Sequence, residues 1–155
     1  MAITKKHILA AVVGGAVAGP LDLLAATAQF GAPFDVICKS VAAGWIGRDA
    51  AMAGGLPIVL LGFFSDLLIS IVAAGVYVIA SPARELQRPW LNGALFGLAM
   101  FTVMRFIIVP LTAAGHGKMS AVVLSESLLV HAFIFGLPVA LIAAWILKPQ
   151  PEPAS

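Results

Sequence analysis

The chain is organised around the stretch Gly62-Phe63-Phe64-Ser65-Asp66-Leu67-Leu68-Ile69-Ser70, which lies inside an apolar run from Leu56 to Ala80. That run is long enough to cross the hydrocarbon core of a bilayer, which takes about 20 residues of helix. Asp66 lies near its centre, where an ionised carboxylate costs about 2.5–3.5 kcal/mol on insertion scales. A chain retains such a group where a partner, a cavity or a function compensates for that cost.

The composition of the whole chain is that of a membrane protein. Of its 155 residues, 61% are hydrophobic and 10% are charged, and the mean hydropathy is +1.06. Soluble domains carry about 25% charged residues, so this chain lacks the charge to cover a water-facing surface. The net charge of +2 is small and scattered, which argues against nucleic acid as a partner. Because Cys38 is the only cysteine, an internal disulfide and a cysteine-based metal motif are excluded.

Three further apolar runs accompany the one around Asp66, so the sequence predicts an all-α bundle of four transmembrane helices. The expected spans are residues 7–29, 56–80, 90–111 and 120–147. Together they form one membrane domain, residues 1–147, followed by a Pro-rich tail, 148–155, that is expected to be disordered. The N-terminus imitates a signal peptide, but Pro20 and Asp22 interrupt the region before the cleavage site, so we expect a retained first span.

The segment between the first two spans is predicted to contain a short helix, residues 34–46, that lies in the membrane interface. An apolar face recurs at three- and four-residue steps through Phe34, Ile37, Val41 and Trp45. Trp45 is expected to anchor this helix at the interface, and Asp35 and Lys39 form an i,i+4 pair on its other side. For the glycine-rich segment 47–55 the sequence leaves two alternatives open, a solvated connection and a re-entrant element.

The distribution of basic residues predicts the orientation of the chain. Five basic residues flank the spans on the side of the termini, namely Lys5, Lys6, Arg84, Arg88 and Lys148. Three lie on the other side, namely Lys39, Arg48 and Lys118. Because basic residues are enriched in cytoplasmic loops, we expect both termini to be cytoplasmic.

Ionisable side chains interrupt all four spans, and we expect them to form one polar cluster in the outer half of the bilayer. Its members are Asp22, Asp66, Arg105, Glu126 and His131. With cytoplasmic termini, four of the five fall within roughly 10 Å of one depth, since a helix rises about 1.5 Å per residue, and Glu126 lies nearer the surface. The supporting polar residues are Gln29, Ser70, Tyr77 and Ser127.

The charges of this cluster do not balance. Three carboxylates face one guanidinium, so at least one acid lacks a cationic partner and is either protonated or holds a proton or metal ion in exchange. Arg105 is expected to pair with one carboxylate and to hydrogen-bond a second. Glu126 and His131 are five residues apart, so on an ideal helix they diverge by about 140°. We therefore place His131 with Asp66 or Asp22, and Glu126 near the outer mouth.

Two glycine pairs, Gly15 with Gly19 and Gly93 with Gly97, have the spacing that lets helices pack closely. Neither pair follows a strand, so a dinucleotide-binding interpretation fails. The sequence contains neither a nucleophile, base and acid at credible spacing nor a paired metal-ligand motif. We therefore assign no catalytic residue and no cofactor, and an intramembrane enzyme is the least favoured class.

Four short motifs carry a resemblance to a known family. They are Ala18-Gly19-Pro20-Leu21-Asp22, Ser40-Val41-Ala42-Ala43-Gly44-Trp45-Ile46-Gly47, Gly54-Gly55 with Leu61-Gly62, and Val130-His131 with Gly136-Leu137-Pro138. Through them the chain resembles a family of small, uncharacterised bacterial four-span membrane proteins. The resemblance implies a location in the bacterial inner membrane and supplies no activity. In that pattern a histidine is expected where this chain has Asp66.

Two functional hypotheses follow. In the first, the polar cluster binds or passes a proton, a cation or a small polar solute. In the second, the chain is a structural or accessory subunit of a larger membrane complex, and its Asp/Arg cluster locks helix packing. A water-accessible cavity that reaches Asp66 favours the first hypothesis, and a dry, fully paired Asp–Arg network favours the second. The lipid bilayer is the expected partner under both, with a homo-oligomer or a membrane complex as the open alternatives.

Overall fold

The computed structural model describes residues 3–81, 88–115 and 119–148, and within these ranges the chain is helical without strands. Four helical segments are long and apolar enough to cross a membrane, namely Lys5–Phe30, Leu56–Ala80, Pro89–Leu111 and Ala121–Leu147. The predicted all-α bundle of four membrane-spanning helices is therefore confirmed, and the chain is a multi-pass membrane protein. Parts of the sequence-based prediction lie outside the described residues, namely Arg84, Lys118 and residues 149–155 of the tail.

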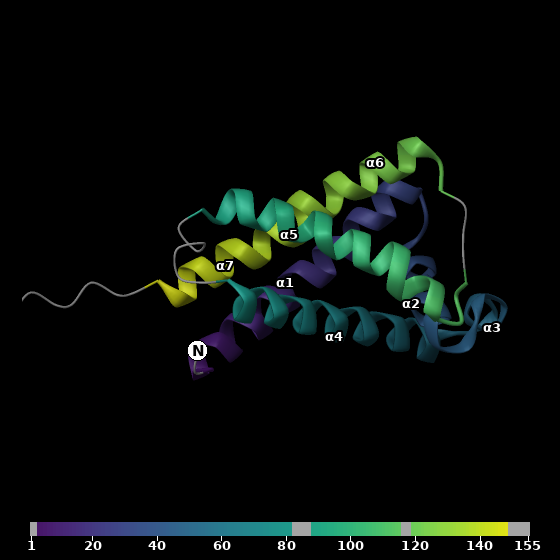
Figure 1. The fold of residues 1–155 in the computed structure, drawn as a ribbon. Coiled ribbons are helices and arrows are strands. Elements are labelled where there is room, and N and C mark those ends of the chain that lie inside the picture. Colours follow the sequence, from purple (N-terminus) through teal and green to yellow (C-terminus); the bar gives the residue numbers. More distant parts are fainter. Residues whose placement is uncertain (1–2, 82–87, 116–118, 149–155) are drawn as a thin grey trace, which may run out of the picture.

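The spans consist of α-helices, and the last two contain wider π-helical turns. In chain order the elements are α1 (Lys5–Phe30), α2 (Phe34–Ile46), α3 (Arg48–Ala53), α4 (Leu56–Ala80), α5 (Pro89–Val103), η2 (Met104–Ile108), η3 (Val109–Leu111), α6 (Ala121–Val130), η4 (His131–Gly136) and α7 (Leu137–Leu147). Figure 1 shows the N-terminus and the end of α7 at one end of the bundle, and α2 with α3 at the opposite end.

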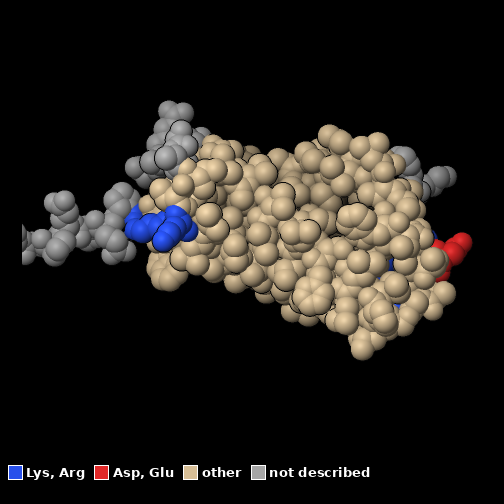
Figure 2. All heavy atoms as spheres, turned by 90° about the horizontal axis from the view of Figure 1, so that it is seen from below, with Lys and Arg blue, Asp and Glu red and all other residues tan. Residues whose placement is uncertain are grey.

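The surface of the bundle is suited to lipid. Backbone groups in hydrocarbon must be hydrogen-bonded internally, so long runs of Leu, Ile, Val and Phe form helices there. On α4, for example, Leu68, Val72 and Val76 point outward, with 57–61% of each residue exposed. In Figure 2 the charged side chains lie at the two ends of the visible face, and uncharged side chains cover its broad middle.

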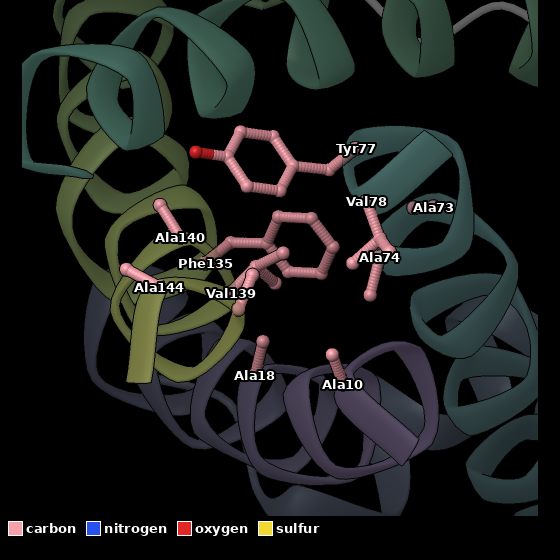
Figure 3. Packing of buried hydrophobic residues seen from close by; sticks show 11 residues of the cluster. Ala10, Ala18, Ala73, Ala74, Tyr77, Val78, Phe135, Val139, Ala140 and Ala144 are labelled. Atoms are coloured by element: carbon pink, nitrogen blue, oxygen red, sulfur yellow. The ribbon is translucent and has the colours of Figure 1, made fainter. Parts of the chain in front are cut away.

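The core in the half of the bundle near the termini is built mainly from alanine. Figure 3 shows Ala10 and Ala18 of α1 facing the cluster of α4 and α7 side chains around Val139. Small side chains let helix backbones approach closely, which is the main source of helix association inside a membrane. Aromatic rings fill the remaining space, with the Phe96 ring centroid 5.0 Å from that of Tyr77.

The two glycine pairs are sites of close helix packing, as the sequence predicts. A Cβ atom added at Gly15 would lie 2.7 Å from the carbonyl carbon of Ser70, in α4. One added at Gly93 would lie 2.9 Å from the carbonyl oxygen of Gly136, in η4. The glycines therefore join α1 to α4 and α5 to η4.

Each π-helical segment ends two residues before a proline. The segment η2 ends at Ile108, before Pro110, and η4 ends at Gly136, before Pro138. A proline cannot donate a backbone hydrogen bond, and its ring clashes with the carbonyl four residues earlier, so a wider preceding turn relieves the clash. The fourth span is distorted in this way before Pro138, whereas α1 continues as an α-helix through Pro20.

The helix α2 has the predicted bounds and packs mainly on α4, where it buries Ile37 and Cys38. The predicted i,i+4 pair is present, with Lys39 Nζ 3.5 Å from Asp35 Oδ2. Trp45 is largely exposed, but its indole Nε1–H donates to Ser65 Oγ on α4 at 2.9 Å. The position of α2 in the membrane interface stays a prediction.

The segment 47–55, for which the sequence left two alternatives, contains the short helix α3. Its Arg48 and Asp49 are exposed and its Ala51 is buried. Figure 1 places α3 beside α2 at the end of the bundle. The chain after the third span is tied to this end as well, because the backbone N–H of Ala113 donates to the carbonyl of Gly44 at 3.0 Å.

Candidate functional site

A cavity of about 320 Å³ lies among the four spans. It is lined by Asp22, Ala26, Gln29, Phe30, Val41, Asp66, Ile69, Ser70, Met100, Phe101, Met104, Arg105, Val109, Met119, Ser127, Val130, His131 and Phe135. The walls are mostly apolar, and each of the four spans contributes at least one ionisable or polar side chain. A mostly apolar cavity with a few polar groups is a candidate binding site.

Four of the five residues of the predicted cluster line this cavity. Asp22 comes from α1, Asp66 from α4, Arg105 from η2 and His131 from η4. Glu126 lies on α6, is exposed, and is not among the lining residues. Of the supporting residues, three line the same cavity, namely Gln29, Ser70 and Ser127.

Tyr77, the fourth supporting residue, lies in a different place. It is buried in the alanine-rich core and lines a separate groove between α4 and α5 with Val76, Leu95 and Phe96. One helical turn separates Tyr77 from Ala73, and two separate it from Ser70, so it shares their face. It lies closer to the end of the bundle that carries the termini, beyond the reach of the cavity.

The close contact of α1 and α4 brings the carboxylate of Asp66 against the helix that carries Asp22. A Cβ atom added at Gly19 would lie 3.1 Å from Asp66 Oδ2 and 2.8 Å from Ser70 Oγ. Gly19 precedes Asp22 by three residues and therefore lies on the same side of α1. The absence of a side chain at Gly19 thus leaves the room in which the polar groups of α4 meet those of α1.

His131 is held in one orientation by a backbone hydrogen bond. Its Nδ1 lies 2.9 Å from the carbonyl oxygen of Ser127, and since a carbonyl only accepts, Nδ1 carries the proton. The other nitrogen, Nε2, lies 3.9 Å from Asp22 Oδ2, which is too long for a direct hydrogen bond. The ring also packs edge-on against Phe101, with centroids 4.9 Å apart.

Gln29 connects the same region of α1 to α6. Its Nε2 donates to Ser127 Oγ at 2.8 Å and to the carbonyl oxygen of Val123 at 3.2 Å. Ser127 therefore receives a hydrogen bond from Gln29 at its hydroxyl and one from His131 at its carbonyl. These bonds fix the wall of the cavity that η4 and α6 form.

Two carboxylate oxygens at the cavity lack a protein partner. Asp22 Oδ1 and Asp66 Oδ2 are buried, and within the described residues neither accepts a hydrogen bond. A buried polar atom without a partner costs about 1–3 kcal/mol, more when it is charged. Arg105 lines the cavity, and its guanidinium carbon lies 5.9 Å from the Phe106 ring centroid. Its expected pairing with a carboxylate stays a prediction.

The arrangement places two carboxyl groups, a guanidinium and an imidazole in an otherwise apolar space. Within the described residues no group of three or more His, Cys, Asp and Glu side chains is placed to hold a metal ion. No protein-family model, curated protein or solved structure matches this chain. The chemistry of the site is therefore inferred from its own residues.

Sequence reasoning missed several cavity residues on the third span, above all Met100 and Met104. A signal for both was present, because they follow Gly93 and Gly97 at steps of three and four residues and so share their helix face. The glycines pack against η4, and the methionines continue that face past the contact into the cavity.

Proposed function

We propose that the cavity binds a proton, a cation or a small polar solute within the membrane. The observation that carries the proposal is the meeting of Asp22, Asp66 and His131 at one cavity, where two buried carboxylate oxygens have no hydrogen-bond partner within the described residues. A proton on a carboxyl group relieves the cost of such an oxygen, and a cation in the cavity lies beside the carboxyl groups that line it. Intramembrane ionisable residues that face a cavity commonly mark solute or ion pathways.

A cavity that reaches Asp66 favours this function over a purely structural lock. A lock works through a dry network in which every charge has a partner. Here a space of about 320 Å³ separates the walls, whereas about 10–15 Å³ is enough to hold one water molecule. Such a space is unnecessary for helix packing and suits an exchangeable occupant.

The test is flux across liposomes that contain the purified protein and a pH-sensitive dye. Under a proton or cation gradient we expect faster dissipation with the wild type than with Asp66→Asn, which removes the charge and keeps the shape of the side chain. Asp49→Asn is the matched control, because Asp49 is exposed on α3 and does not line the cavity. Flux equal to that of empty vesicles for all three proteins would contradict conduction.

A structural or accessory role is the second candidate. Its support is the pair of hydrogen bonds from Gln29 to Ser127 and Val123, which join α1 to the fourth span beside the cavity. Under this function the charges mainly stabilise packing, so both Asp66→Asn and Arg105→Gln should lower the thermal stability of the protein in detergent. If neither variant loses stability, the charges do not act as a lock.

We further propose that the chain resides in the bacterial inner membrane with both termini cytoplasmic and assembles with copies of itself or with a membrane complex. The N-terminus and the end of α7 lie at the same end of the bundle. This arrangement supports placing both termini on one side of the membrane. Reporter enzymes that are active on one side of the membrane, fused to each terminus, test this. Opposite activities of the two fusions would contradict the topology.

A further inference from the structure

We propose that the occupant of the cavity is a monovalent organic ammonium ion with an apolar body. The inference rests on the proposed function, because it specifies the class of solute that the same cavity takes. It combines the charge of the lining residues, the size and chemistry of the walls, and the packing of α4 and α5.

The balance of acidic and basic residues in the lining suits one monovalent cation. The ionisable lining residues are Asp22, Asp66, Arg105 and His131. Two carboxyl groups and one guanidinium line the cavity beside the His131 imidazole, so the acids outnumber the arginine by 2 − 1 = 1. One monovalent cation balances this excess acid, and it lies beside the carboxyl groups of Asp22 and Asp66, which both line the cavity.

The walls suit an organic cation better than a bare metal ion. A metal ion needs several oxygen or nitrogen ligands that converge at about 2–2.6 Å, and the described residues hold no such group of His, Cys, Asp and Glu. An ammonium with carbon substituents instead contacts carboxylates and aromatic ring faces. Phe30, Phe101 and Phe135 supply three rings to the lining, and Met100 and Met104 supply further apolar surface.

The volume agrees with a small organic molecule. Pockets for small molecules have volumes of about 300–1,000 Å³ and mostly apolar walls with a few polar groups that fix orientation. This cavity, at about 320 Å³, lies at the lower end of that range. A single aromatic ring that carries an ammonium group fits it, and a proton alone leaves it empty.

Both α4 and α5 contribute to the wall of the cavity. α4 packs closely on α1 and α2, and α5 packs on η4 and α7, whereas α4 and α5 are not a closely packed pair in the described part of the bundle. Ile69 on α4 and Met104 beyond α5 both line the cavity. A second groove follows the seam between α4 and α5 past Leu95. The Tyr77 and Phe96 rings meet across this seam, with centroids 5.0 Å apart, and nearer to Asp66 the walls from α4 and α5 provide apolar surface for the body of such a solute.

The test is calorimetric titration of the purified full chain in neutral detergent with phenyltrimethylammonium. We expect saturable binding, and binding at least about tenfold weaker for tetramethylammonium, which carries the charge without the ring. Asp66→Asn should weaken binding of phenyltrimethylammonium at least about tenfold, since a charge pair about 5 Å apart in a partly buried site is lost. Asp22→Asn, as a second variant, should weaken it in the same direction, and Asp49→Asn should leave it unchanged.

Absence of binding to the wild type would overturn the inference, as would equal affinity for the wild type, Asp66→Asn and Asp22→Asn. Circular dichroism and a single elution peak for each variant establish that it is folded. The flux assay distinguishes failure of the ammonium inference from failure of the proposed function. Proton or cation flux that depends on Asp66, without ammonium binding, leaves the proposed function standing and removes the ammonium ion as its solute.

Discussion

Replacing Gly93 by alanine should separate α5 from η4 and destabilise the half of the bundle that supports His131. A Cβ atom at this position would lie 2.8 Å from Ala140 Cβ and 2.9 Å from both Gly136 O and Leu137 Cα. Ordinary contact begins at 3.4 Å, so relief requires a movement of 3.4 − 2.8 = 0.6 Å at the closest atom. Two of the three atoms belong to the backbone and cannot rotate away.

Gly75→Ala is the matched control for this prediction. Gly75 lies within α4, and a Cβ atom there would be 3.8 Å from its nearest neighbour, Ala11 Cβ. Both substitutions change helix propensity by the same amount, about 1 kcal/mol in water, so this contribution cancels in the comparison. The remaining difference is the cost of overpacking, about 1–3 kcal/mol.

The assay is unfolding of both variants in mixed micelles of SDS and a mild detergent, followed by circular dichroism. We expect the free energy of unfolding of Gly93→Ala to be about 1–3 kcal/mol below that of Gly75→Ala. If Gly93→Ala is at least as stable as Gly75→Ala, the close contact between α5 and η4 is refuted. The wall of the cavity at His131 would then be placed incorrectly as well.

Two smaller predictions concern hydrogen bonds, one between α2 and α4 and one at the cavity. Trp45→Phe should lower the free energy of unfolding by about 1 kcal/mol, since the indole N–H then no longer donates to Ser65 Oγ; in a double-mutant cycle with Ser65→Ala, additive losses would contradict the bond. For His131, nitrogen NMR at a pH where the ring is neutral should find the proton on Nδ1, because that atom donates to the Ser127 carbonyl. A proton on Nε2 would contradict this orientation.

The sequence predicted the fold closely because, inside a membrane, the composition of each segment decides its secondary structure. A backbone in hydrocarbon must be helical, so apolar runs translate directly into spans, and the bounds of α4, Leu56–Ala80, were predicted to the residue. The helix α2 followed from an apolar face at three- and four-residue steps. Gly93 was predicted to be a packing residue from its spacing alone, and its contact with η4 agrees.

The geometry of the site was harder to predict, since it depends on departures from ideal helices. Rotations of about 100° per residue do not describe a π-helical turn, which contains an extra residue. One such segment begins at His131 and another contains Arg105, so the directions of both side chains departed from simple helix periodicity. The sequence left two neighbours open for His131, namely Asp22 and Asp66. In the structure its Nε2 lies 3.9 Å from Asp22 Oδ2. The depth of each side chain in the membrane could be estimated from its position along its helix. Which helix lies beside Asp66, and so its contact with Gly19, could not be predicted in this way.

The central claim is that Asp66 lines a cavity open to small solutes, and cysteine accessibility tests it most directly. In a Cys38→Ala background, which removes the only native thiol, three variants on α4 are compared, Asp66→Cys, lipid-facing Val72→Cys and core Val78→Cys. Val72 is 58% exposed to the outside of the bundle, and Val78 is 1% exposed. Each is treated in liposomes with a small cationic methanethiosulfonate, which reacts with hydrated thiolates. We predict rapid labelling of Asp66→Cys alone. Labelling of Asp66→Cys as slow as that of Val78→Cys would contradict the cavity.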